Sequence, residues 1–177
     1  MKHPILTTLA TLLFVAASAL AAPPPEVKAK AEKRLAELQS LASEATVIAE
    51  VKAYNAKPAS SMTNDAWKAL SVISPEVKEL TKNTLGIFLK GKKTPDIAEI
   101  FVNGADGGKV AFLSKTSNWT HKGKAKHDQP MAGKTWMGDV ELDESTGKQS
   151  VQVALPIKDG DKVIGSIVIG LSVPDLK

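Results

Sequence analysis

Apolar residues recur at helical spacing along the first third of the chain, from Glu26 to about Tyr54, without an intervening Gly or Pro. The recurring positions are Val27, Ala31, Leu35, Leu38, Leu41, Ala42, Ala45, Ile48 and Ala49. With Lys and Glu between them, this period predicts a long amphipathic helix over 22–56. Such a helix would be about 45 Å long. Two arrangements stay open: a projecting N-terminal part that pairs with another helix, or a helix that lies wholly on a sheet.

Shorter helices are expected over 57–94. The tripeptide Ser-Pro-Glu at 74–76 is typical of a helix start, with a capping hydroxyl, a proline in the first turn and an early acid. The apolar stripe of this helix consists of Val77, Leu80, Leu85 and Phe88. Gly91 and Pro95 end the predicted helix.

Beyond Pro95 the period of the apolar residues changes to two, which indicates β-strands over 95–177. Turn residues at 103–108 and at Asp159-Gly160 separate consecutive strands, as in hairpins. The expected strands are 97–102, 109–114, 135–142, 149–157 and 162–173, with a long polar loop over 116–136. Helices followed by consecutive hairpins predict an α+β fold with one antiparallel sheet of about five strands.

The last predicted strand has one well-filled face and one thin face. Ile167, Ile169 and Leu171 share the first face, whereas Ser166 and Gly170 lie on the second. A thin face leaves room for either a packed helix or a ligand beneath the polar loop. Both occupants stay open at this point.

The first 21 residues have the pattern of a secretory signal peptide. Lys2 precedes a run from Ile5 to Leu20 without charged residues, and small residues at Ala19 and Ala21 form a cleavage site. We therefore expect 1–21 to be removed on export. The remaining 22–177 would be a single periplasmic or secreted domain without a further membrane span.

Composition narrows the classes of function. The net charge of +4 is too small for a dedicated nucleic-acid binder, so no nucleic-acid partner is expected. Cys is absent, which excludes disulfides, thiolate nucleophiles and thiolate metal sites. His121 and His127 are six residues apart and do not share a helix face, so we expect no metal. Without a nucleophile elbow, a Walker loop or a dinucleotide fingerprint, neither catalysis nor a cofactor is expected.

Several short motifs follow one another in the second half of the chain. They are Ile100-Phe101-Val102, Asp106-Gly107-Gly108, Asp143-Glu144-Ser145-Thr146-Gly147, Val153-Ala154-Leu155-Pro156-Ile157, Asp159-Gly160 and Val163-Ile164-Gly165. In this order the chain resembles a Cache domain, the extracytoplasmic relative of the PAS fold. That family also begins with a long helix, so the resemblance extends over the mature chain. It implies a stand-alone sensor that holds a small molecule between the sheet and the long loop.

Three positions depart from the amino-acid-binding version of that family. That version has an arginine followed by Trp-Tyr in the loop, a tyrosine before the Asp-x-x-Thr-Gly turn, and an aspartate in the last strand. Here the loop over 116–136 contains no arginine, Glu141 lies near the expected tyrosine, and Gly170 lies near the expected aspartate. The resemblance therefore implies another ligand, such as an organic acid or an amine.

The candidate ligand-binding residues are Trp119, Trp136, Ser114, Thr116, Lys134 and Ser166. The two tryptophans offer a flat apolar wall and one N–H each, although each could equally plug the core. Lys134 represents a lysine-rich loop that offers point charges to an anionic ligand where arginine is absent. The three hydroxyl residues lie at the start of the loop and on the thin sheet face.

Together these patterns predict a non-catalytic domain that binds a small-molecule ligand and signals through a separate partner, such as a membrane receptor. The alternative is a scaffold protein. In that case the long first helix would form a homodimer or dock on a partner.

Signal-peptide cleavage is directly testable. N-terminal sequencing of protein recovered from outside the cytoplasm should begin at Ala22, because Ala19 and Ala21 form the small-residue cleavage site. A recovered chain that still begins at Met1 would contradict this prediction.

Overall fold

The structure is a computed structural model that describes residues 22–143 and 148–177. The predicted signal peptide over 1–21 and the turn at Thr146-Gly147 lie outside the described residues. Within the described ranges the chain has an α+β fold with one five-stranded sheet that is antiparallel throughout, as the sequence predicted. No helix in these ranges combines the length and the apolar character that crossing a membrane requires.

The elements follow the chain from helices to strands. The helices are α1 (Pro25–Ala42), α2 (Ala45–Asn55), α3 (Asn64–Ala69), α4 (Pro75–Lys82), α5 (Thr84–Gly91) and α6 (Ala125–Met131). The strands are β1 (Ile97–Gly104), β2 (Lys109–Phe112), β3 (Trp136–Asp143), β4 (Lys148–Asp159) and β5 (Lys162–Ser172), and a 3-10 turn (Val173–Asp175) follows β5.

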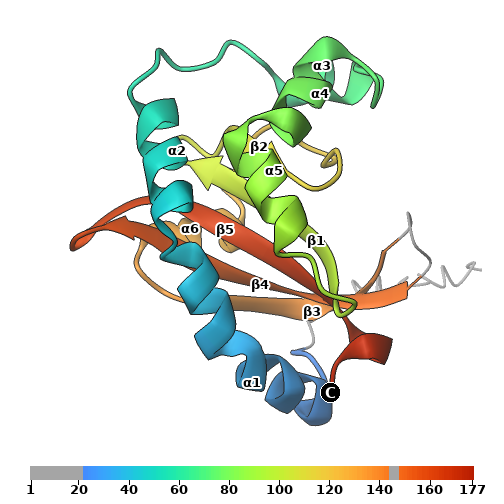
Figure 1. The fold of residues 1–177 in the computed structure, drawn as a ribbon. Helices are drawn as coiled ribbons and strands as arrows, with labels where there is room; N and C mark the ends of the chain where they lie inside the picture. Colours follow the sequence, from blue (N-terminus) through green and yellow to red (C-terminus); the bar gives the residue numbers. More distant parts are fainter. Residues whose placement is uncertain (1–21, 144–147) are drawn as a thin grey trace, which may run out of the picture.

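The strand order is β2-β1-β5-β4-β3, so the last strand lies in the centre of the sheet. Helices α1, α2 and α5 cover one face of the sheet, and α6 lies against the opposite face (Figure 1). The larger core lies on the first face and includes Leu38, Val51 and Ile167. The smaller core lies on the second face around Phe101 and Val168. The alternation of β5 between two faces is as predicted.

The helix expected over 22–56 is interrupted, and α1 and α2 are separated at Ser43 and Glu44. Ser43 Oγ donates to the Gln39 carbonyl at 2.9 Å, and Glu44 has an extended ψ of 136°. A serine hydroxyl competes for helical carbonyls, so the helix does not run through this point. The break lets α1 pack mainly on β4 while α2 packs on β1. Of the two arrangements left open, the structure shows the helices lying on the sheet.

The helix expected between residue 75 and Gly91 is also two helices, α4 and α5, which meet at Asn83. Asn83 Oδ1 accepts from the Gly86 N–H at 2.7 Å and caps α5, while its Nδ2 donates to the Val110 carbonyl at 2.9 Å. This side chain therefore joins the helix pair to β2. Ser74, which was expected to cap α4 with its hydroxyl, makes no side-chain cap hydrogen bond.

The polar loop over 116–136 contains α6, which the sequence did not predict. Pro130 lies inside this helix of 7 residues, and Gly123 and Gly133 flank it, so its residues are typical of a loop. Packing holds it in place, because His127 and Pro130 are buried between α6 and the sheet. A packed helix therefore covers part of the thin face of β5.

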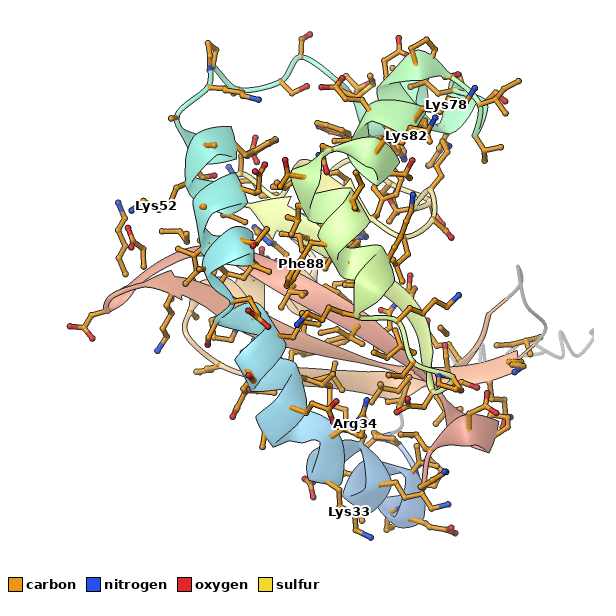
Figure 2. All side chains as sticks on the ribbon, in the orientation of Figure 1. Lys33, Arg34, Lys52, Lys78, Lys82 and Phe88 are labelled. Atoms are coloured by element: carbon orange, nitrogen blue, oxygen red, sulfur yellow. The ribbon has the colours of Figure 1, made fainter. Side chains whose placement is uncertain are left out.

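Arg34, the only arginine, connects α1 to the start of β1. Its Nε lies 2.8 Å from Asp96 Oδ2, and its Nη1 contacts Glu37 on the same helix. Figure 2 shows Phe88 between α2 and α5, where it packs against the larger core, and Lys33 on the outer side of α1. The helical layer is thus joined to the sheet by apolar packing and by ion pairs, which include Arg34 with Asp96 and, from α2 to β4, Lys52 with Asp159.

Close packing at Gly165 gives a stability prediction. A Cβ there would lie 2.4 Å from the Asn103 carbonyl oxygen and 3.0 Å from Val51 Cγ1. Because the carbonyl belongs to the neighbouring strand, we expect Gly165→Ala to lower the free energy of unfolding by about 1–3 kcal/mol in urea denaturation. The control Gly91→Ala meets nothing within 4 Å and should leave stability unchanged or slightly raised. Equal stability of Gly165→Ala and wild type would contradict this packing.

Candidate functional site

Lys109 on β2 is fully buried on the second face of the sheet. Its Nζ lies 2.7 Å from Asn103 Oδ1 and 2.6 Å from His121 Nδ1. It also lies 4.9 Å from the centre of the Phe101 ring, which itself stacks on His121. Among the described residues no carboxylate forms an ion pair with this ammonium. Neutral acceptors and a ring therefore surround it.

The same network continues through Ser166 to α6. Asn103 Nδ2 donates to Ser166 Oγ at 2.9 Å, and Ser166 Oγ lies 2.8 Å from His127 Nδ1. His127 also has a hydrogen bond to the backbone of Ala105. The network thus connects β1, β2, β5 and α6.

Burial decides the protonation of this network. It lowers the pKa of Lys109 from 10.5 to about 7, and the charge of Lys126 acts in the same direction, whereas Glu99 opposes it. Burial is also the main cause that lowers the pKa of His121 to about 2, followed by the charge of Lys109. His121 is therefore neutral at physiological pH, with Nδ1 free to accept from Lys109.

A cavity of about 600 Å³ opens beside the network, between the sheet and the loop that follows β2. We call it the sheet cavity. Its floor comes from β1, β3 and β4, and residues 114–118 form a wall. Phe101 and His121 line it as well, so the buried network lies directly behind its surface.

A hydrogen-bonded chain crosses the floor of the sheet cavity from α6 to β1. Lys126 Nζ donates to Gln152 Oε1 at 2.5 Å, and Gln152 Nε2 donates to Glu99 Oε1. Glu99 lies over Gly170 of β5, since a Cβ on Gly170 would be 2.6 Å from Glu99 Cγ. Glycine at 170 therefore leaves room for the Glu99 side chain on the floor.

The structure brings some of the predicted site residues together and leaves others apart. Ser114 and Thr116 line the sheet cavity. Ser166 lies behind it in the buried network, and Lys134 is exposed beyond the end of α6. Neither Ser166 nor Lys134 is part of the lining.

The two tryptophans of the predicted site, Trp119 and Trp136, are half-buried and pack against the smaller core. The Trp119 ring lies 5.3 Å from that of Trp67, whose Nε1 donates to the Thr116 carbonyl at 2.7 Å. Trp136 lies on β3 opposite Ala154 of β4. Neither Trp119 nor Trp136 is among the lining residues, and their contact with a ligand stays a prediction.

The lining residues that were not named as ligand-binding residues from the sequence include Glu99, Gln152 and Lys126. Strand alternation carries a signal for the first two, because Glu99 shares a strand face with Phe101, and Gln152 shares one with Ala154. Lys126 gave no such signal because α6 was not predicted.

Within 22–143 and 148–177, no group of three His, Cys, Asp or Glu side chains converges in a way that could hold a metal ion. His121 and His127 instead join the buried network through Lys109 and Ser166.

Neither a protein-family model nor a curated protein matches the sequence. Solved structures do match. The sensory domain of the Campylobacter jejuni chemoreceptor Tlp3 is 15% identical, with 85% of this chain and 58% of that chain covered and a TM-score of 0.50. The E. coli DcuS sensor domain is 17% identical, with 85% and 93% covered and a TM-score of 0.47. The ligand-binding domain of the Pseudomonas aeruginosa chemoreceptor PctC in complex with GABA is 14% identical, with 85% and 60% covered and a TM-score of 0.44.

The chain has the fold of a Cache-type sensory domain, as its motifs predicted. It spans a little over half the length of the Tlp3 domain, 58%. At 15% identity this likeness concerns the fold, and the function has to be argued from the cavity.

The buried lysine gives a pH prediction. Between pH 7 and 10.5 the unfolded chain keeps a proton on Lys109 that the folded chain has lost, so stability should rise with pH. Urea denaturation should show a gain on the order of 3 kcal/mol from pH 7 to 9.5. Between about pH 2 and 6.5 the unfolded chain likewise keeps a proton on His121 that the folded chain has lost, so stability should rise with pH there too.

The variant Lys109→Met is the control, because it removes this titration and should flatten the rise. Measurements end at pH 9.5 because burial raises the pKa of Tyr54, which makes stability fall once unfolded tyrosine ionises. A wild-type profile as flat as that of Lys109→Met would contradict the assignment.

Proposed function

We propose that this chain is a non-catalytic, extracytoplasmic domain that binds a small molecule in the sheet cavity and signals through a separate partner. The observation that supports this most directly is the cavity of about 600 Å³ on a Cache-type fold. Its volume is in the range of pockets that take metabolites or drug-sized ligands. The predicted signal peptide supports a periplasmic or secreted location.

The arrangement of the side chains also supports binding rather than catalysis. His121, the histidine on the cavity wall, accepts a hydrogen bond from Lys109, and burial lowers its pKa to about 2. A base needs a pKa near the working pH, so this imidazole is poorly suited to proton transfer.

The scaffold alternative receives less support from the first helix. Its apolar residues, including Leu38 and Leu41, are buried against the sheet of the same chain. Little apolar surface of α1 is left over for a homodimer or another partner.

Ligand binding can be tested by blocking the cavity. A thermal-shift screen of organic acids, amines, sugars and purines should yield a stabilising compound, because a ligand that binds only the folded state raises its melting temperature. Thr116→Trp places a large ring on the cavity wall and should abolish the shift, whereas Ser61→Trp on an exposed loop should retain it. A screen without any stabilising compound, or a shift unchanged in Thr116→Trp, would count against the function.

Calorimetric titration of Trp119→Ala and Trp136→Ala with the best compound tests the contact predicted from the sequence. A ring that stacks on the ligand should cost roughly 1–3 kcal/mol of binding free energy when it is removed. Unchanged affinity in both folded variants would assign the tryptophans to the core alone.

A further inference from the structure

Lys126 presents an incompletely paired ammonium to the sheet cavity. It lies in the first turn of α6 and is half-buried at the cavity wall. Its three N–H donors have one hydrogen-bond acceptor among the described residues, the neutral amide oxygen of Gln152 at 2.5 Å. Within 22–143 and 148–177, the Lys126 ammonium forms no ion pair with a carboxylate.

A half-buried cation that forms no direct ion pair with the described residues is an energetic cost to the folded protein. Burial is the largest cause that lowers the pKa of Lys126, and the carboxylates of Glu99 and Glu141 only partly oppose it. Buried charges in proteins are normally paired, because the attraction offsets the loss of hydration. A carboxylate bound in the cavity would provide the missing counter-ion and accept the two remaining N–H groups.

The rest of the lining points to a ligand rich in hydrogen-bonding groups. Most ligand pockets are mainly apolar, but the wall at 114–118 carries Ser114, Thr116, Ser117 and Asn118. On the floor, Ser150 and Gln152 add a hydroxyl and an amide. These groups match the hydroxyls of a polyhydroxylated molecule better than a hydrocarbon chain.

The two carboxylates at the floor restrict the charge of the ligand. Glu99 and Glu141 both line the cavity close to Lys126, so a second anionic group placed beside them would be repelled. The other charged lining residues are Lys93 and Lys115. A ligand hydroxyl, in contrast, can donate to either carboxylate.

We propose that the sheet cavity takes a hydroxyl-rich monocarboxylate whose carboxylate is held by the Lys126 ammonium. The inference rests on the proposed function and specifies the class of ligand for the same site. It replaces the loop lysine expected from the sequence, Lys134, with one on the cavity wall.

Titration calorimetry with four related six-carbon compounds tests the ligand class. Gluconate has one carboxylate and five hydroxyls, sorbitol lacks the carboxylate, glucarate adds a second carboxylate, and hexanoate lacks the hydroxyls. Gluconate should bind tightest of the four. The inference is overturned if sorbitol, glucarate or hexanoate binds as tightly, or if the best compound in the broader screen carries no carboxylate.

Three variants test whether Lys126 holds the carboxylate of the ligand. Lys126→Met should weaken gluconate binding roughly 10- to 100-fold, on the scale of hydrogen bonds to a charged group. Lys126→Arg keeps the charge and should retain most of the affinity, which separates lost binding from lost folding. Lys124→Met removes an exposed lysine next to α6 that does not line the cavity, and should bind like wild type.

The possible failures are distinguishable. Wild-type affinity in Lys126→Met would overturn the contact between Lys126 and the ligand carboxylate, and so would an equal loss of affinity in Lys124→Met or Lys134→Met. Neither result would contradict ligand binding in the sheet cavity. If no compound of any class stabilises the protein, the proposed function fails, and the inference fails with it.

Discussion

The ammonium group of Lys109 has to be satisfied at a place on the sheet that water does not reach, and the arrangement around it follows from that requirement. Asn103 and His121 accept from it, and the Phe101 ring faces it. Removing one of these partners would leave a buried hydrogen-bond donor unsatisfied, at the full desolvation cost of that group. The acceptors come from β1 and from the loop after β2, so satisfying Lys109 also fixes that loop against the sheet.

The two faces of the sheet therefore have different roles. The first face is apolar, and α1, α2 and α5 close it into a core that provides most of the hydrophobic stabilisation. The second face is mixed, with a small aromatic core and a polar network that meet at Phe101. Apolar packing alone cannot fill such a face, which is why a short helix covers part of it and a cavity lies beside that helix.

Sequence periodicity revealed part of the candidate site. Ser114 and Thr116 could be placed there because they follow a predicted strand at the start of a long polar loop. Lys126 could not, because α6 is held by contacts with the sheet and its own residues favour a loop. Lys109 gave no sign of burial either, since lysine is almost never fully buried and its partners lie elsewhere in the chain.

The sequence by itself determined the α+β class, the order of the elements, the antiparallel strands and the two faces of β5. These features depend on hydrogen-bonding period and on apolar alternation, which are local properties of the chain. The helix breaks at Ser43 and Asn83 rest on local hydrogen bonds that the apolar period does not reveal. Only the tertiary structure decided the existence of α6 and the lining of the cavity. These depend on contacts between distant residues, such as Asn103 with Ser166, 63 positions apart. Such pairs form because β5 returns between β1 and β4, and no local pattern encodes that order.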